Sequence, residues 1–176
     1  KVVCYNFEKD GENNINHQVG VEEYSDSIIP EIYFMNDSTA VAVGDHSFAI
    51  YGGRAVPEKK QEVQLTQEIK SSFHTDKYIG FVLLNEEKSG YEVRLYNRAG
   101  KQVMNYKING EYSNVQMIKD EIIMYEGSRC CIITKTGIPR FQGDLKVDIM
   151  SVVPGFGLNK YYVMSANELR VIYLII

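Results

Sequence analysis

Short apolar runs separated by Gly, Asn, Asp and Ser make up most of the chain, and helical periodicity is nearly absent. One run occurs five times, each time as apolar residues followed by an aromatic residue or Thr and then a turn. Its aromatic or Thr position recurs about every 38 to 46 residues, at Tyr5, Tyr51, Tyr96, Thr134 and Tyr173. Such runs predict β-strands, and this spacing is typical of the four-stranded blades of a β-propeller.

Each complete copy contains further predicted strands. The strand before the repeated run is apolar on both faces, which is expected of a strand lying between two neighbouring sheets; these strands are at 40–44, 79–83, 122–126 and 161–165. Innermost strands come earlier, at 32–35, 72–74 and 115–118, and each is followed by Asp or Asn, which suit tight hairpins. The outermost strands are more polar, as at 102–106 and 138–141.

The predicted fold is therefore all-β, with antiparallel four-stranded propeller blades in one domain over 1–176. The approximate blades are 2–24 (partial), 29–69, 69–110, 113–145 and 147–175. The ends are uneven, because the N-terminal segment offers two strands where closure of the last blade needs one. We favour the C-terminal half of a larger propeller, and the alternative is a self-contained ring of four blades.

Charge and composition exclude several partners. The chain has 176 residues and a formal charge of −4, so attraction to nucleic acid or to an anionic membrane is disfavoured. Its longest apolar runs are much shorter than the roughly 20 residues that span a bilayer. Because it begins with Lys1 and lacks a signal-like segment, we expect a piece of a longer protein.

Three cysteines are too few for a disulfide framework. Cys130 and Cys131 are neighbours in a predicted strand, where adjacent side chains point to opposite faces. We expect one buried thiol and the other on the opposite face, with a vicinal disulfide as the alternative. Zinc is rejected, because the Cys and His spacings offer too few ligands.

No residue is assigned a catalytic, cofactor-binding or metal-binding role. The histidines His17, His46 and His74 are interpreted as turn residues, and the carboxylate pairs Glu22–Glu23 and Glu86–Glu87 as solvated charges. The mixed run 58–62 is interpreted as a solvated connection to an outer strand, and 155–157 as a loop between strands. The thirteen tyrosines could line a sugar-binding surface, but most recur at fixed blade positions, which favours packing.

The phrases at 29–36, 42–45, 48–51 and 160–164 resemble an uncharacterised family of Gram-positive bacterial proteins. The resemblance implies one N-terminal transmembrane helix, outside this chain, and an extracytoplasmic propeller-like domain of which the chain is the C-terminal half. It implies a location on the cell surface. These phrases are structural, so no functional residue is carried over.

The sequence thus favours a non-enzymatic extracytoplasmic interaction or scaffold module with a protein partner, because radial repetition leaves a broad face of loops. The alternative is a carbohydrate-binding or enzymatic propeller, whose axial site is completed by a missing N-terminal half. In that case a cell-surface polysaccharide becomes a candidate partner. No cofactor is expected under the favoured interpretation.

Overall fold

The computed structural model describes residues 1–5, 18–25, 27–53, 56–85 and 90–174. These residues form seventeen β-strands in five antiparallel sheets, which follow one another in chain order. The predicted all-β fold with four-stranded antiparallel blades is confirmed. None of the described segments is a helix long and apolar enough to cross a membrane.

The strands of each sheet are consecutive in the chain. The first sheet has β1 (Val2–Tyr5) and β2 (Gln18–Glu22). The second has β3 (Glu31–Asn36), β4 (Thr39–Val43), β5 (Ser47–Gly52) and β6 (Glu58–Gln64). The third has β7 (Ile69–His74), β8 (Tyr78–Leu84), β9 (Tyr91–Asn97) and β10 (Gln102–Ile108). The fourth has β11 (Asn114–Ile118), β12 (Glu121–Glu126), β13 (Arg129–Thr134) and β14 (Pro139–Asp144), and the fifth has β15 (Ser151–Pro154), β16 (Lys160–Met164) and β17 (Leu169–Tyr173).

Every sheet is a meander, in which each strand pairs with the next one in the sequence. Most residues of the predicted runs lie in these strands: the run 122–126 is contained in β12, whereas the runs 40–44 and 161–165 extend one residue beyond β4 and β16. One interpretation is wrong. Residues 58–62 do not connect to an outer strand but begin β6 itself, whose charged side chains face solvent because an outer strand has no neighbour on one side.

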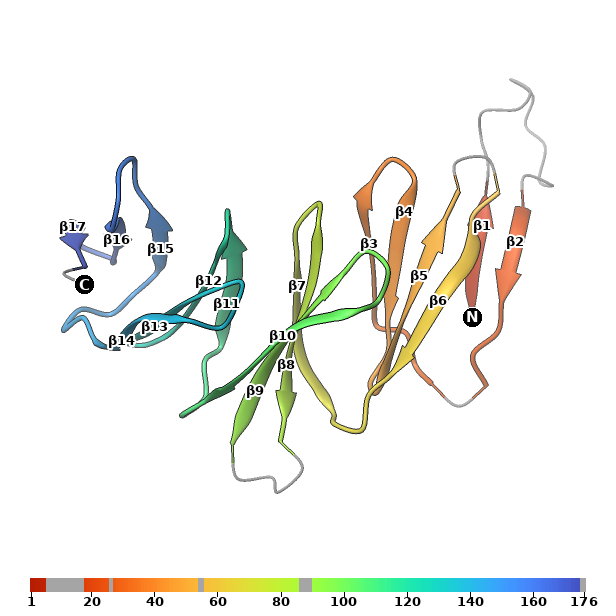
Figure 1. Ribbon diagram of the computed structural model, residues 1–176, viewed down its shortest axis with the longest axis horizontal. Helices are drawn as coiled ribbons and strands as arrows, with labels where there is room; N and C mark the ends of the chain where they lie inside the picture. The colour runs from red at the N-terminus through yellow and green to blue at the C-terminus, as the bar shows by residue number, and fades with distance from the viewer. Residues whose placement is uncertain (6–17, 26, 54–55, 86–89, 175–176) are drawn as a thin grey trace.

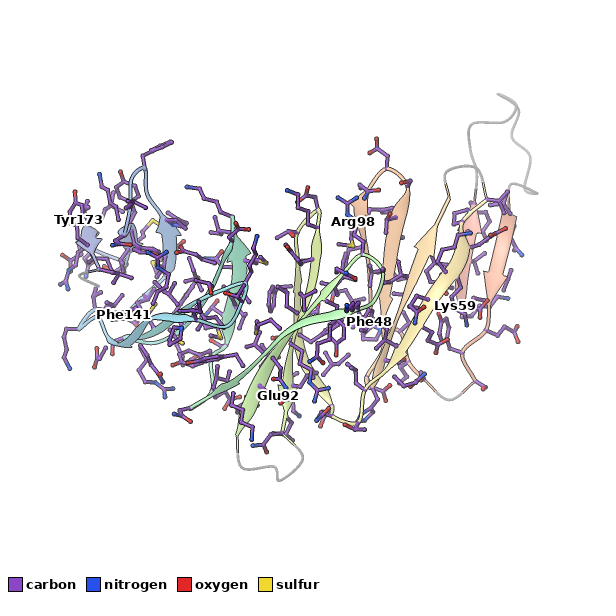
Figure 2. All side chains as sticks on the ribbon, in the orientation of Figure 1. Phe48, Lys59, Glu92, Arg98, Phe141 and Tyr173 are labelled. Atoms are coloured by element: carbon purple, nitrogen blue, oxygen red, sulfur yellow. The ribbon has the colours of Figure 1, made fainter. Side chains whose placement is uncertain are left out.

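The core is divided into layers, each between two consecutive sheets. One cluster joins the second and third sheets through Phe48 and Phe81, whose ring centroids are 4.9 Å apart. Another joins the third and fourth sheets, and a further cluster joins the fourth and fifth through Ile123 and Val163. Figure 2 shows Phe48 among the packed side chains in the middle of the row of sheets. A sheet between two such layers must be apolar on both faces, which explains the two-faced runs in the sequence.

The fourth sheet shows why the cysteine prediction is wrong in part. Cys130 packs toward the fifth sheet and Cys131 toward the third. The two thiols do point to opposite faces, but both faces are covered, and the residues are 0% and 1% exposed. Both are free cysteines, so the vicinal disulfide considered as an alternative is absent.

The sheets form an open row, with the first and fifth sheets at opposite ends (Figure 1). The self-contained ring of four blades is therefore not what the described residues form. The burial of the repeated tyrosines agrees with an open row of sheets. Tyr51 and Tyr96 are 5% and 3% exposed between sheets, whereas Tyr5 and Tyr173, in the two end sheets, are 51% and 65% exposed.

Candidate functional site

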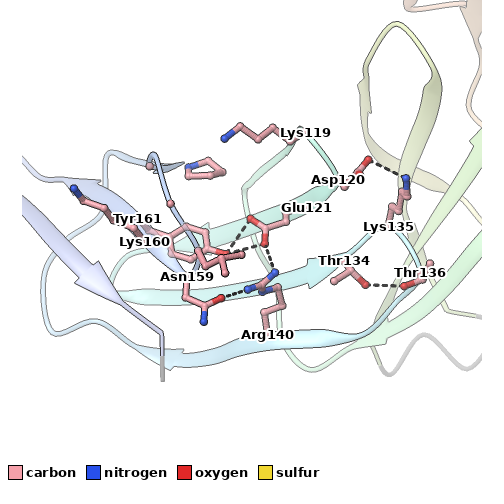
Figure 3. Close-up of a pocket in the computed structure, with 14 residues that line it drawn as sticks. Lys119, Asp120, Glu121, Thr134, Lys135, Thr136, Arg140, Asn159, Lys160 and Tyr161 are labelled. Atoms are coloured by element: carbon pink, nitrogen blue, oxygen red, sulfur yellow. Dashed lines mark hydrogen bonds and ion pairs between the residues drawn. The ribbon is translucent and has the colours of Figure 1, made fainter. Parts of the chain in front are cut away.

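A cavity of about 370 Å³ opens between the fourth and fifth sheets (Figure 3). Three turns surround it: β11–β12 at 119–120, β13–β14 at 135–138 and β15–β16 at 155–159. In a meander, successive hairpins alternate between the two ends of the sheet, so the first and third hairpins of the fourth sheet lie at one end. The first hairpin of the fifth sheet lies beside them. The cavity is thus a consequence of how two neighbouring blades meet.

The floor of the cavity is a polar clasp of Glu121, Arg140, Asn159 and Tyr161. The Tyr161 hydroxyl donates to the Glu121 carboxylate, with both oxygens at 2.9 Å. Arg140 forms an ion pair with Glu121 at 3.0 Å and also donates to Oδ1 of Asn159. Glu121 and Arg140 belong to the fourth sheet and the other two to the fifth, so the clasp ties the sheets together.

The clasp residues are mostly shielded from water. Tyr161 is buried, and burial together with the hydrogen bond to Glu121 raises the pKa of its hydroxyl. Asn159 has a left-handed backbone (φ 60°), a conformation that Asn tolerates better than most residues. The Glu121 carboxylate and the Tyr161 hydroxyl are engaged within the clasp, although Nε of Arg140 is buried without a hydrogen-bond partner among the described residues. This arrangement suits a structural connection between blades more than proton transfer to a substrate.

Lysines lie around the cavity. Lys135 forms an ion pair with Asp120 at 3.0 Å. Lys119, in the β11–β12 turn, is exposed and has no carboxylate partner among the described residues. The stem of Lys160 borders the cavity, while its ammonium lies 5.1 Å from the centre of the Tyr162 ring, on the other face of the sheet.

The histidines and carboxylate pairs considered in the sequence analysis do not form a common site among the described residues. His46 is exposed in the β4–β5 turn, where its backbone N–H donates to Asp45. His74 is not in a turn but at the end of β7, and its ring stacks on Tyr33 with centroids 3.8 Å apart. Glu22 ends β2 and pairs with Lys59. His17 and the pair Glu86–Glu87 lie outside the described residues.

Within the described ranges, no three His, Cys, Asp or Glu side chains are close enough to hold a metal ion. The interpretation of 155–157 as a loop between strands is confirmed, since these residues form the β15–β16 turn.

A second polar pair, also missed from the sequence, lies between the second and third sheets. Glu92 is buried on β9 and forms an ion pair of 2.5 Å with Arg94, two residues further along the same face. Ile79, Phe81 and Leu83 line that face on β8. The alternation of Glu92 and Arg94 with the buried Val93 and Leu95 is the signal that could have revealed it, because two charges on a two-sided strand must face a neighbouring sheet.

Solved structures with the same fold cover most of this chain. The BBS1N protein in complex with ARL6DN has a TM-score of 0.54 at 9% identity, over 82% of this chain and 50% of that one. Hsv2p of Kluyveromyces lactis has a TM-score of 0.52 at 14% identity, over 84% and 47%. Sqt1 of Saccharomyces cerevisiae has a TM-score of 0.51 at 10% identity, over 78% and 42%. These are propeller-type folds, and the chain spans about half the length of each.

No curated protein matches the sequence. A family model does, and it covers nearly the whole chain, residues 1–174. The all-β repeat, the layered core and this match agree, and the chain belongs to the family of unknown function DUF5711.

Proposed function

We propose that this chain is part of a non-enzymatic propeller that acts as an interaction or scaffold module. Its binding capacity would then lie in blade faces and turns rather than in an active site. The clasp supports this view, because the carboxylate of Glu121 is already engaged by Tyr161 and Arg140. A general base needs a carboxylate or imidazole free to reach the proton that it removes.

The observation that carries the proposal is the uncovered outer face of the fifth sheet, which we call the end face. It is apolar and exposed over three strands, at Val153, Met164, Leu169, Val171 and Tyr173. The equivalent positions of an inner sheet, Val93 and Leu95 on β9, are fully buried by the next sheet. An exposed apolar surface of this kind marks an interaction site.

We propose further propeller blades as the occupant of the end face. The outer edge of β17 has no partner strand among the described residues, so the fifth sheet also has room for a fourth strand. The similar structures are about twice as long as this chain, which is consistent with blades beyond those described. The chain would then be the C-terminal half of a larger ring, with a protein partner bound to the assembled ring.

We also propose an extracytoplasmic location with a membrane anchor outside this chain. Only the resemblance of the sequence to a family of anchored proteins supports it. Protease treatment of intact cells that express the full-length protein tests this placement. Degradation by external protease is expected, and complete protection in intact cells but not in lysed cells would overturn it.

Sedimentation of the isolated chain at micromolar concentration tests the end face. We expect self-association of the wild-type chain, and a monomer for the double variant Leu169→Ser, Val171→Ser, because the variant replaces exposed apolar side chains without touching the core. The matched control is Ile28→Ser, an exposed apolar residue far from this face. A wild-type chain that remains a compact monomer at every concentration would contradict the proposal.

A further inference from the structure

The β15–β16 turn displays two large apolar side chains beside the cavity of Figure 3. Phe156 is 92% exposed and Leu158 is 90% exposed, the highest values among the exposed large apolar residues of the described chain. Isolated apolar residues on a surface need no explanation. Two of them almost fully exposed on a single turn, next to a cavity, do form a feature that a partner can use.

The turn is held in place rather than left loose. Its ends are joined by the backbone hydrogen bond from Gly155 to Lys160, at 2.7 Å. Arg140 of the neighbouring sheet donates to the side chain of Asn159, and the carbonyl of Asn159 accepts from the backbone N–H of Leu174 at 2.8 Å. A fixed turn loses little conformational entropy when it binds, so its apolar side chains can contribute fully to affinity.

Positive charge exceeds negative charge around the cavity beside the turn. The lining includes four basic side chains and two acidic ones, at Lys119, Lys135, Arg140, Lys160, Asp120 and Glu121. The two acidic side chains are paired with Lys135 and Arg140, whereas Lys119 has no carboxylate partner among the described residues. In a chain with a net charge of −4, this local excess beside an apolar turn creates a surface that is complementary to acidic groups.

We propose that the β15–β16 turn binds an acidic peptide segment of a partner protein, with apolar side chains on Phe156 and Leu158 and a carboxylate near Lys119. The cavity of about 370 Å³ favours a peptide over a lipid surface, because a protruding side chain can enter a recess that a flat bilayer cannot fill. This inference rests on the proposed interaction function, but it uses a surface separate from the end face.

Selection from a phage-displayed library of random short peptides against the full chain provides the probe. We expect the selected peptides to combine Asp or Glu with large apolar residues. Their affinity, measured by fluorescence anisotropy of the labelled peptide, should fall at least about tenfold for Phe156→Ser, for Leu158→Ser and for Lys119→Glu. These side chains are exposed, so the variants should fold normally, which circular dichroism and the melting temperature verify.

Matched controls are Ile28→Ser and Lys107→Glu, exposed residues outside the turn and the cavity, which should leave the affinity unchanged. Peptides that bind the turn variants as tightly as wild type would overturn the inference, as would a failure to select acidic peptides. If affinity is lost only in Leu169→Ser, Val171→Ser, the inference fails while the interaction function stands. Binding to vesicles of phosphatidylcholine and phosphatidylglycerol that Phe156→Ser abolishes, without peptide binding, would identify a membrane and overturn it too.

Discussion

The far end of the Phe73 ring occupies the space beside Gly80, its register partner on the neighbouring strand β8. A methyl group added at Gly80 would overlap the far end of the ring, and Phe73 is itself buried between the third and fourth sheets. The absence of a side chain at Gly80 therefore makes the space that Phe73 fills. This glycine is a packing requirement of the core, not a turn residue.

Replacing Gly80 by Ala should lower the free energy of unfolding by about 1–3 kcal/mol, the usual cost of overpacking a core. Urea denaturation measures the change. The double variant Phe73→Leu, Gly80→Ala should recover part of the loss relative to the sum of the single changes, because a smaller side chain leaves room for the new methyl group. Strict additivity of the two substitutions would show that they do not share this space.

Much of the fold can be predicted from the sequence, because a blade between two others must be apolar on both faces. That rule locates β8 and β12 from their uninterrupted apolar runs. It fails for β6, because the charged residues Glu58, Lys59 and Lys60 resemble a solvated loop in the sequence. In the structure they are the exposed first residues of an outer strand. The Asp and Asn positions indicate where hairpins occur, but in the β11–β12 turn it is Lys119, and not Asp120, that has a left-handed backbone.

The candidate site was much less accessible to sequence reasoning. Tyr161 and Glu121 are 40 residues apart, and Arg140 and Asn159 are 19 apart, in strands and turns of different sheets. Nothing local distinguishes Glu121 and Arg140 from solvated charges at strand ends. Their partnership depends on the distance between two blades, which local patterns do not encode.

Both core cysteines should matter for stability. Because Cys130 and Cys131 are buried in different layers, Cys130→Ser and Cys131→Ser should each cost about 1–3 kcal/mol, through the burial of a hydroxyl in place of a thiol. Urea denaturation with and without reductant measures these losses. A substantial loss at one position with little loss at the other would match the expectation of a single buried thiol. A urea midpoint that depends on reductant would contradict the free thiols.

Thiol reactivity gives an independent check of the same burial. Burial raises the pKa of Cys130 to about 12 and that of Cys131 to about 11, so almost no thiolate is present at neutral pH. An aromatic disulfide reagent should therefore label partly exposed Cys4 in the native protein, and the other two only after unfolding. The variant Cys4→Ser, which should show no fast phase, is the control. Fast labelling that persists in this variant would be incompatible with the layered core.

The clasp should show energetic coupling. We expect Tyr161→Phe and Glu121→Gln each to cost about 1–2 kcal/mol, because each leaves a shielded polar group without its partner. The double variant should cost less than the sum, by at least about 0.5 kcal/mol, since the two residues contact each other. The exposed ion pair of Lys146 with Asp144 is the control, and Lys146→Gln should change stability by less than about 1 kcal/mol. Coupling within error of zero would contradict the clasp.

Tyr33 allows the sharpest test, because its hydroxyl is buried without a hydrogen-bond partner among the described residues. Burial, and secondarily Glu31, raises the pKa of Tyr33, whereas an unfolded tyrosine ionises near pH 10. Above about pH 10 the unfolded chain therefore binds fewer protons at this position than the native protein, and stability must fall as pH rises, by up to about 1.4 kcal/mol per pH unit.

Tyr33→Phe removes this contribution and keeps the ring that stacks on His74. We expect the variant to be at least as stable as wild type at pH 7 and less sensitive to alkali, as measured by urea midpoints between pH 7 and about pH 11. A variant that is clearly less stable at pH 7, with an unchanged pH dependence, would mean that the hydroxyl has a partner and is not desolvated.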